Sequence, residues 1–165
     1  MQTPVLDAFA KKAVVFDKAY AASFPTVPNR ADIMTGRHAY RYMGWEALPR
    51  HLPTLAEQLT KAGVITMSIQ DTPVTIKQGF HFERGFNGFQ WIRGQDSDNN
   101  RTDYTTEPLL PCTAEKLRTG NRLERLHFLN CTFRRNERDT LVAQTMTSAV
   151  DWLEANYKHE KFFLY

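Results

Sequence analysis

The sequence predicts an α/β fold in which helices alternate with mostly parallel strands. Two helix patterns are each followed by an apolar segment with strand character: residues 53–62 precede 64–69, and 138–157 precede 161–165. Such alternation is typical of parallel strands that are joined by helices. With 165 residues, 42% of them hydrophobic, the chain is large enough to bury one ordinary core.

The first twenty residues predict a helix and then a short strand. The helix spans residues 3–10, because Thr3 can cap free amide groups and Pro4 suits the first helical position. Residues 13–20 have the β-branched and aromatic content of a strand.

Two prolines, Pro25 and Pro28, are expected to bracket a turn. Residues 29–35 then predict a helix that ends at Gly36, because glycine readily adopts the left-handed conformation of a helix C-terminus. The helix over residues 53–62 should present its apolar residues to the core, namely Leu52, Leu55, Ala56 and Leu59.

The glycine- and aromatic-rich residues 79–112 predict an ordered excursion over one end of the sheet, with a mobile tip at 96–106. Helices follow at 121–133 and 138–157. The second carries an apolar stripe that should face the core, formed by Val142, Met146, Ala149, Val150 and Leu153. Because the chain stops inside the strand at 161–165, we expect a partial domain that is truncated at both ends.

Charge and composition narrow the class of protein. The formal net charge of +3 permits an anionic substrate but requires neither nucleic acid nor an acidic membrane. No apolar run approaches the roughly 18 residues of a membrane-spanning helix, and the N-terminus lacks a secretion signal. Cys112 and Cys131 lack metal-site spacing, so we expect separate thiols in a reducing, cytoplasmic compartment, with a single disulfide as the alternative.

The most informative segment contains Thr26 and Arg30. Thr26 lies at a turn into a helix, where amide groups and the helix dipole stabilise anions and favour ionisation of a nucleophile. Arg30 follows one helical turn later, so its guanidinium can return to the same side and bind two oxygens of a sulfate or phosphate group. Alternatively, Thr26 only caps the helix and Arg30 forms a surface ion pair.

An ordered set of motifs surrounds this segment. It comprises the start of the chain (TPVLD, residues 3–7), VFDKAY (15–20), TVPNRADIMTGR (26–37), HLPTLAE (51–57), Asp71-Thr72-Pro73, and residues 149–153 and 162–165. The set resembles the sulfatase family of the alkaline phosphatase superfamily. That family reads TPNLD, then RF-x-NAY, then C/S-x-P-x-R-A-x-x-x-TGR.

The resemblance implies a metal-dependent hydrolase of sulfate or phosphate esters. It also implies that residues 1–165 are the N-terminal part of an alkaline-phosphatase-like α/β sandwich. Sulfatases convert the first motif position, cysteine or serine, to formylglycine; oxidation of Thr26 would give a ketone instead. Superfamily relatives use an unmodified threonine, which by analogy makes Thr26 the nucleophile and Arg30 the oxyanion stabiliser. We therefore expect cleavage of phosphodiesters or phosphonate esters.

A divalent metal ion is implied by the same resemblance, with Ca²⁺, Mn²⁺ and Zn²⁺ left open. Thr26 would be a shared ligand. The family's carboxylates before the first helix, and its downstream Asp-His or Asp-Asn pair, have no counterpart in this sequence. Since a hard divalent ion needs several oxygen ligands, we expect that the chain alone neither holds the metal well nor turns over substrate.

Asp71 and Thr72 follow a predicted strand, at the end of the sheet where open α/β folds bind ligands. They are therefore candidate substrate-binding residues. Lys77 and His81 are nearby candidates, with solvated loop residues as the alternative. Val74 stands where related sequences often have histidine.

The expected partner is a small-molecule sulfate or phosphate ester, with no nucleic acid and no membrane. A second hypothesis is a non-catalytic sulfatase remnant that acts as a packing or interaction module. A third is a nucleic-acid binder that uses the arginines between 118 and 138, whose affinity would fall steeply with salt. Acidic residues such as Glu124 and Glu137 alternate with those arginines, which favours a solvated helix face.

Overall fold

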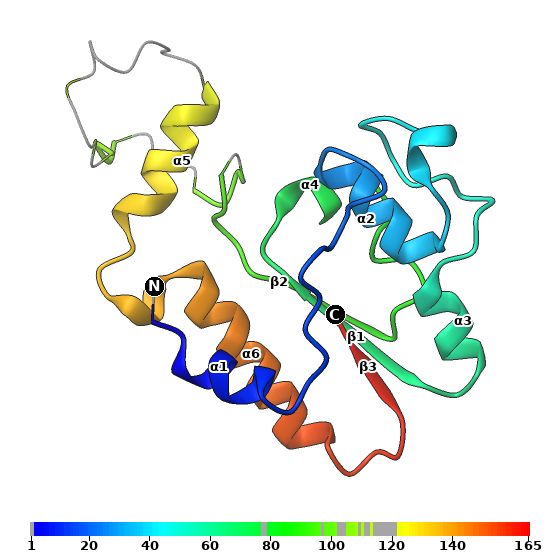
Figure 1. The fold of residues 1–165 in the computed structure, drawn as a ribbon. Helices are drawn as coiled ribbons and strands as arrows, with labels where there is room; N and C mark the ends of the chain where they lie inside the picture. The colour runs from blue at the N-terminus through cyan, green and yellow to red at the C-terminus, as the bar shows by residue number, and fades with distance from the viewer. Residues whose placement is uncertain are drawn as a thin grey trace.

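A parallel three-stranded sheet lies at the centre of the fold. The computed structural model describes residues 2–76, 79–96, 98–101, 105–108, 110, 113 and 122–165. The strand order is β2-β1-β3, formed by β1 (Ile65–Gln70), β2 (Gly88–Trp91) and β3 (Phe162–Leu164). Helices surround these strands (Figure 1). The predicted α/β class with parallel strands is confirmed.

The five predicted helices are present with shifted ends, and the structure adds three short ones that were not predicted. In chain order the helices are α1 (Pro4–Ala10), α2 (Thr26–Thr35), η1 (Ala39–Arg41), α3 (Leu55–Lys61), α4 (Pro73–Ile76), α5 (Arg122–Thr132), η2 (Glu137–Asp139) and α6 (Leu141–Asn156). The three additions are η1, α4 and η2. Gly36 ends α2 in the left-handed conformation, as predicted. In the described residues, no helix combines the length and apolar character that crossing a membrane needs.

One hydrophobic core holds α2 in place. It contains Val27, Ala31 and Met34 of α2 together with Ala39, Met43, Leu48 and Phe82. Val74 of α4 and Tyr165, which follows β3, pack against it. Burial of these apolar side chains fixes α2 against η1 and against the segments that hold Leu48 and Phe82.

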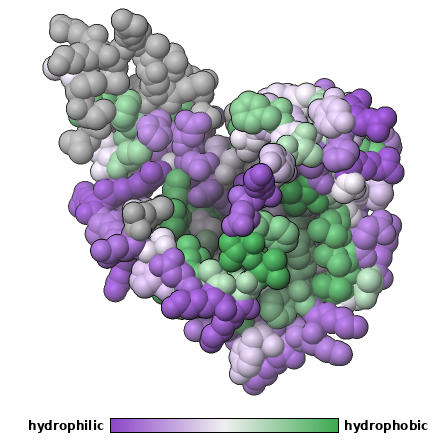
Figure 2. Space-filling view, viewed as in Figure 1, coloured by the Kyte–Doolittle hydropathy of each residue, from purple (hydrophilic) through white to green (hydrophobic). Residues whose placement is uncertain are grey.

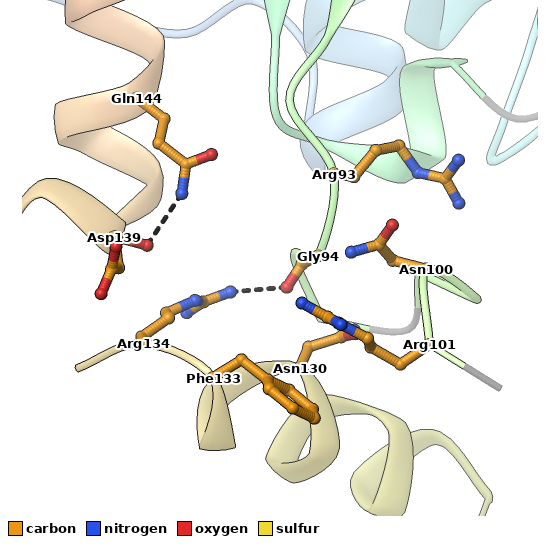
Figure 3. A pocket seen from close by; sticks show the side chains of 9 residues that line it. All are labelled: Arg93, Gly94, Asn100, Arg101, Asn130, Phe133, Arg134, Asp139 and Gln144. Atoms are coloured by element: carbon orange, nitrogen blue, oxygen red, sulfur yellow. Dashed lines mark hydrogen bonds between the residues drawn. The ribbon is translucent and has the colours of Figure 1, made fainter. Parts of the chain in front are cut away.

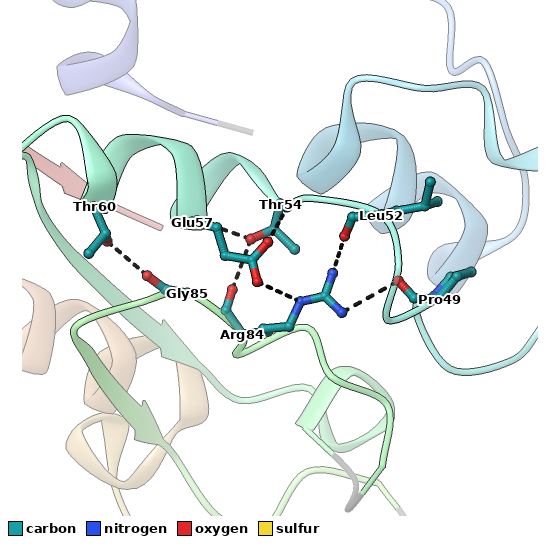
Figure 4. A network of polar contacts seen from close by, with 7 residues as sticks. All are labelled: Pro49, Leu52, Thr54, Glu57, Thr60, Arg84 and Gly85. Carbon is teal, nitrogen blue, oxygen red and sulfur yellow. Dashed lines mark hydrogen bonds and ion pairs between the residues drawn. The ribbon is translucent and has the colours of Figure 1, made fainter.

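A polar network joins α3 to the loop before β2 (Figure 4). Thr54, 1% exposed, accepts a hydrogen bond from the Glu57 amide at 3.1 Å and donates one to the Arg84 carbonyl at 3.0 Å. The Glu57 carboxylate accepts a hydrogen bond from the Thr54 amide at 2.8 Å, which completes a capping box. The Arg84 side chain reaches the carbonyls of Pro49 and Leu52, and its Nε lies 3.1 Å from Glu57 as an ion pair without hydrogen-bond alignment.

Two predictions for the N-terminal region are wrong. Residues 13–20 form no strand, and their large side chains are exposed, with Val14 81% and Phe16 77% accessible. Strand-forming residue types are not sufficient here, because this segment pairs with none of the described strands. Pro28 does not close a turn: it lies in the first turn of α2, where its missing N–H is tolerated.

Strand β2 was missed, because it lies within the segment predicted as an excursion. Gly88 and Phe89 pair with Met67 and Ser68 of β1. A Cβ at Gly88 would approach the Met67 sulfur to 2.6 Å, so the glycine leaves room for the Met67 side chain. Phe89 and Trp91 are residue types enriched in strands, so part of the signal was present in the sequence.

The apolar stripe of α6 faces the core only in part, contrary to the prediction: Ala149 and Leu153 are half-buried, and the other three residues are exposed. Val142, Met146 and Val150 are 69%, 56% and 50% exposed. The helix turns other residues to the sheet: Ser148 accepts a hydrogen bond from Gln90 of β2, and Trp152 packs edge-on against Phe162 of β3. Leu55 of α3, also assigned to the core, is 38% exposed. Figure 2 shows apolar surface gathered in the middle of the face in view, with hydrophilic side chains around it.

Candidate functional site

Thr26 is the first residue of α2, and its side chain is exposed. The preceding residue, Pro25, occupies the N-cap position, and this helix end has no side-chain cap. Within the described residues, the Thr26 hydroxyl makes no hydrogen bond. The interpretation that Thr26 only caps the helix is therefore wrong, and the hydroxyl is accessible at the positive end of the helix dipole.

A half-buried aspartate, Asp32, connects α2 to the segments on either side of the helix. Asp32 Oδ1 accepts hydrogen bonds from Ser23 Oγ at 2.9 Å and from the Ala39 amide at 2.6 Å. The Tyr40 amide donates to the same Ser23 oxygen at 3.1 Å. These bonds fasten the segment before α2 and the start of η1 to one residue in the C-terminal half of the helix. Sequence reasoning missed this arrangement; its signal was an aspartate between the buried Ala31 and Met34.

Arg30 is half-buried and points to the end of the sheet. Its Nη1 donates a hydrogen bond to Tyr165 Oη at 2.8 Å, and its guanidinium carbon lies 5.8 Å from the Tyr165 ring centre. It forms no ion pair within the described residues, so the surface-ion-pair interpretation is wrong. A guanidinium has five N–H donors, and Tyr165 takes one, which leaves donors for an anion. Sequence reasoning did not find Tyr165.

The backbone of Tyr165 connects Arg30 to the sheet. Its amide donates to the Met67 carbonyl at 2.9 Å, and its carbonyl accepts from the Ile69 amide at 2.8 Å. Because β1 and β3 are parallel, their C-terminal ends lie at one edge, and Arg30 reaches that edge through the tyrosine hydroxyl.

Asp71 and Thr72 lie at the same edge, directly after β1 and before α4. Both are half-buried, and Thr72 Oγ1 donates to Asp71 Oδ1 at 3.2 Å. The Thr72 carbonyl accepts from Thr75 Oγ1 at 2.9 Å, which shapes the turn into α4. The structure thus places both residues at the strand end, as the sequence predicts. His81 is half-buried with a left-handed φ of 65°, and Lys77 lies outside the described residues.

The residues that the structure describes do not form a metal site by themselves. Nowhere among them do three His, Cys, Asp or Glu side chains gather at ligand spacing. Thr26 offers a single hydroxyl, which does not fit the several oxygen ligands of a hard divalent ion. The one described cysteine, Cys131, is a free thiol, and Cys112 lies outside the described residues.

An α/β sheet with an accessible hydroxyl and a guanidinium on one helix is an arrangement suited to oxyanion esters. The sulfatase family model matches residues 1–165, so the chain belongs to the sulfatase family and thereby to the alkaline phosphatase superfamily. The resemblance stated above is confirmed. At family level the protein is a sulfatase-like hydrolase, from a family that acts on small-molecule sulfate esters and typically uses a divalent metal. No curated protein and no solved structure matched the chain.

Proposed function

We propose that this protein cleaves phosphodiesters or phosphonate esters with Thr26 as the nucleophile and Arg30 as the oxyanion stabiliser. One observation carries the proposal: the Thr26 hydroxyl is exposed and unbonded to described residues at the start of α2, with Arg30 one turn later. A secondary alcohol cannot become the aldehyde of formylglycine. An unmodified alcohol instead supports direct attack on phosphorus.

The proposed reaction has two balanced steps. In the first, the Thr26 oxygen forms a bond to phosphorus, the ester P–O bond breaks, and the threonine proton ends on the departing alcohol. In the second, water attacks phosphorus, the bond between phosphorus and the Thr26 oxygen breaks, and a proton from that water restores the hydroxyl, so that a phosphate monoester or a phosphonate is released. The remaining N–H donors of Arg30 bind the non-bridging oxygens, whose charge grows in the transition state. Asp71 and Thr72 contact the alcohol part of the substrate.

A panel of three esters tests this proposal: an aryl sulfate, a phosphodiester and a phosphonate ester, assayed on the natural protein that contains residues 1–165 with Ca²⁺, Mn²⁺ or Zn²⁺ added. We expect faster cleavage of the two phosphorus esters. Thr26→Ala should abolish it, whereas Thr147→Ala, at an exposed position of α6, should not. Sulfate ester cleavage that survives Thr26→Ala would defeat the assignment.

Arg30 is tested with the same panel. Removing a charge-assisted contact to a transition state costs about 2–3 kcal/mol, so Arg30→Gln should lower kcat/KM by about 30- to 150-fold. Tyr165→Phe removes only the hydroxyl partner of Arg30 and should have a smaller effect. Equal rates for Arg30→Gln and wild type would exclude the oxyanion role.

We further propose that Thr26 is the one metal ligand this chain supplies, and that the isolated 165-residue chain binds no divalent ion tightly. The described residues contain no cluster of three ligating side chains to supplement it. Calorimetric titration with Ca²⁺, Mn²⁺ and Zn²⁺ checks this, and tight binding of any of them would contradict it.

A non-catalytic interaction module is the second candidate, favoured by the exposed apolar side chains of α6 and of α1, where Phe9 is 70% accessible. Such a module should cleave none of the three esters with any of the three ions. Cleavage that depends on Thr26 would exclude it.

A further inference from the structure

An open pocket of about 380 Å³ lies beyond the C-terminal end of α2, where the chain enters η1. It is lined by Arg37, His38, Arg41 and Tyr42, and all four residues are exposed. The volume is within the range of small-molecule sites. Thr26 begins the same ten-residue helix at its other end, about 15 Å away. The pocket is therefore separate from the site of the proposed function and does not depend on it.

The backbone around this pocket is held from two sides. Gly36 ends α2 in the left-handed conformation and turns the chain toward η1. The amide of Ala39, a fully buried core residue, donates to Asp32 Oδ1 at 2.6 Å. The next amide, of Tyr40, donates to Ser23 Oγ at 3.1 Å. Because the lining residues start from a fixed backbone, little conformational freedom is lost when a ligand binds.

Tyr42 forms an aromatic wall with a fixed orientation. Thr35 Oγ1 donates its proton to the Ala31 carbonyl at 2.7 Å, so the Tyr42 hydroxyl, 3.1 Å away, donates to the same Thr35 oxygen. The surface of the pocket is mostly carbon, as expected for a tyrosine ring and arginine stems. Such a surface favours a ligand with an apolar body over a bare ion.

Arg37 and Arg41 supply the charge. Among the described residues, neither guanidinium takes part in an ion pair or a hydrogen bond, and none of the described lining residues is acidic. A guanidinium presents a planar fork of N–H donors that matches the two oxygens of a carboxylate. The pocket thus combines two free forks with a carbon surface.

The carboxylates of this segment reduce the positive charge without pairing with these arginines. Asp32 accepts from backbone and serine donors, and its Oδ2 is buried, so it cannot contact a ligand. Glu46 Oε1 accepts from the Gly44 amide at 3.4 Å and does not line the pocket. Residues 32–51 carry three arginines against these two carboxylates, which leaves one net positive charge. The dipole at the end of α2, about half an elementary charge, lowers this value without reversing it.

A second pocket, of about 410 Å³ beside α5 and α6, is less suited to an anion (Figure 3). Arg93 there is paired with the carboxylate of the buried Asp98 through two contacts of 2.8 Å. The hydrogen bond to Asp98 raises the pKa of Arg93. Asp139 lines this pocket together with Arg134. Its arginines thus have acidic neighbours, whereas the lining at the end of α2 has none among the described residues.

We infer that the pocket of Arg37, His38, Arg41 and Tyr42 binds an aromatic carboxylate, a molecule with a planar ring system and one carboxylate group. The ring system packs against Tyr42, His38 and the arginine stems, and the carboxylate accepts hydrogen bonds from the two guanidinium groups. A neutral aromatic molecule would leave the guanidinium groups without a partner. A small anion such as acetate would leave the carbon surface in water.

The test is titration of the isotope-labelled 165-residue chain with 2-naphthoate, 2-naphthamide and acetate, followed by amide chemical shifts. 2-Naphthamide has the same rings without the charge, and acetate has the charge without the rings. We expect 2-naphthoate to bind at least about tenfold more tightly than either, with shift changes concentrated at residues 36–43. Equal affinity for 2-naphthamide or acetate, no binding of 2-naphthoate, or changes centred elsewhere would overturn the inference.

Variants locate the binding. Arg37→Gln and Arg41→Gln should each weaken binding of 2-naphthoate about tenfold, whereas Arg50→Gln, at an exposed position of the same segment outside the lining, should not. Thr26→Ala should leave the affinity unchanged, so this site and the proposed reaction are tested separately. Arg41 is exposed, so its replacement leaves the core intact, and affinity equal to that of Arg50→Gln would overturn the inference.

Discussion

Replacement of Thr54 by valine should destabilise the fold far more than its small chemical change suggests. Valine keeps the shape of threonine and removes one oxygen. That oxygen accepts from the Glu57 amide and donates to the Arg84 carbonyl (Figure 4). Loss of the N-cap costs about 1 kcal/mol. The Arg84 carbonyl, left without its donor in a buried setting, adds about 1–3 kcal/mol. We expect a total of about 2–4 kcal/mol.

Urea unfolding followed by circular dichroism measures this loss as a lower transition midpoint at unchanged slope. Thr54→Ser keeps the hydroxyl and removes a methyl group, so it should cost only about 1 kcal/mol. Thr147→Val, at an exposed position of α6, controls for the change of residue type and should lie within about 0.5 kcal/mol of wild type. If Thr54→Val is no less stable than Thr54→Ser, the network does not hold α3 to the loop.

Three further changes can be measured in the same unfolding assay. Gly85→Ala should lower the free energy of unfolding by about 3 kcal/mol or more, because its Cβ would lie 2.5 Å from the Glu57 amide nitrogen at a φ of 91°. Gly63→Ala, which has open space at a φ of 79°, should lower it by about 1–2 kcal/mol. Equal losses for the two variants would contradict the close approach of Gly85 to Glu57. Asp32→Ala should lower the free energy of unfolding by about 2–3 kcal/mol, because it removes the acceptor of two hydrogen bonds. A loss below about 0.5 kcal/mol would show that this carboxylate does not hold α2. Met34→Ala, in the core, should lower the free energy of unfolding by about 2–5 kcal/mol. Met146→Ala, on the exposed side of α6, should lower it by less than about 0.5 kcal/mol. The reverse order would mean that α6 packs through its apolar stripe.

Local signals in the sequence predicted most elements of the fold. Gly36 marked the end of α2 because its left-handed conformation is a property of a single residue. The segment at β1 marked a strand because none of its residues is exposed, as in a central strand. The stripe of α6 shows the limit of this reasoning: periodicity identified an apolar face, but the neighbours of a face are set by tertiary packing.

In the candidate site, too, local sequence predicted some features, whereas others depend on contacts between distant parts of the chain. Thr26 and Arg30 are four residues apart on one helix, so their placement followed from the sequence alone. Tyr165, which binds Arg30, is 135 positions away in the chain, and nothing local to either residue indicates the contact. Asp32 was missed for a related reason, because its partners, Ser23 and Ala39, come from segments that fold back on either side of the helix.

Tyr165 makes the fixed conformation of the Arg30 side chain depend on the pairing of β3 with β1. The same residue continues the hydrogen-bonded ladder from β3 onto β1 and presents its hydroxyl to the guanidinium. Fraying of β3 would therefore release the arginine, while an anion seated on the arginine would oppose that fraying. Slower amide hydrogen exchange at Ile69 and Tyr165 would accordingly report occupancy of the oxyanion position, without any need for turnover.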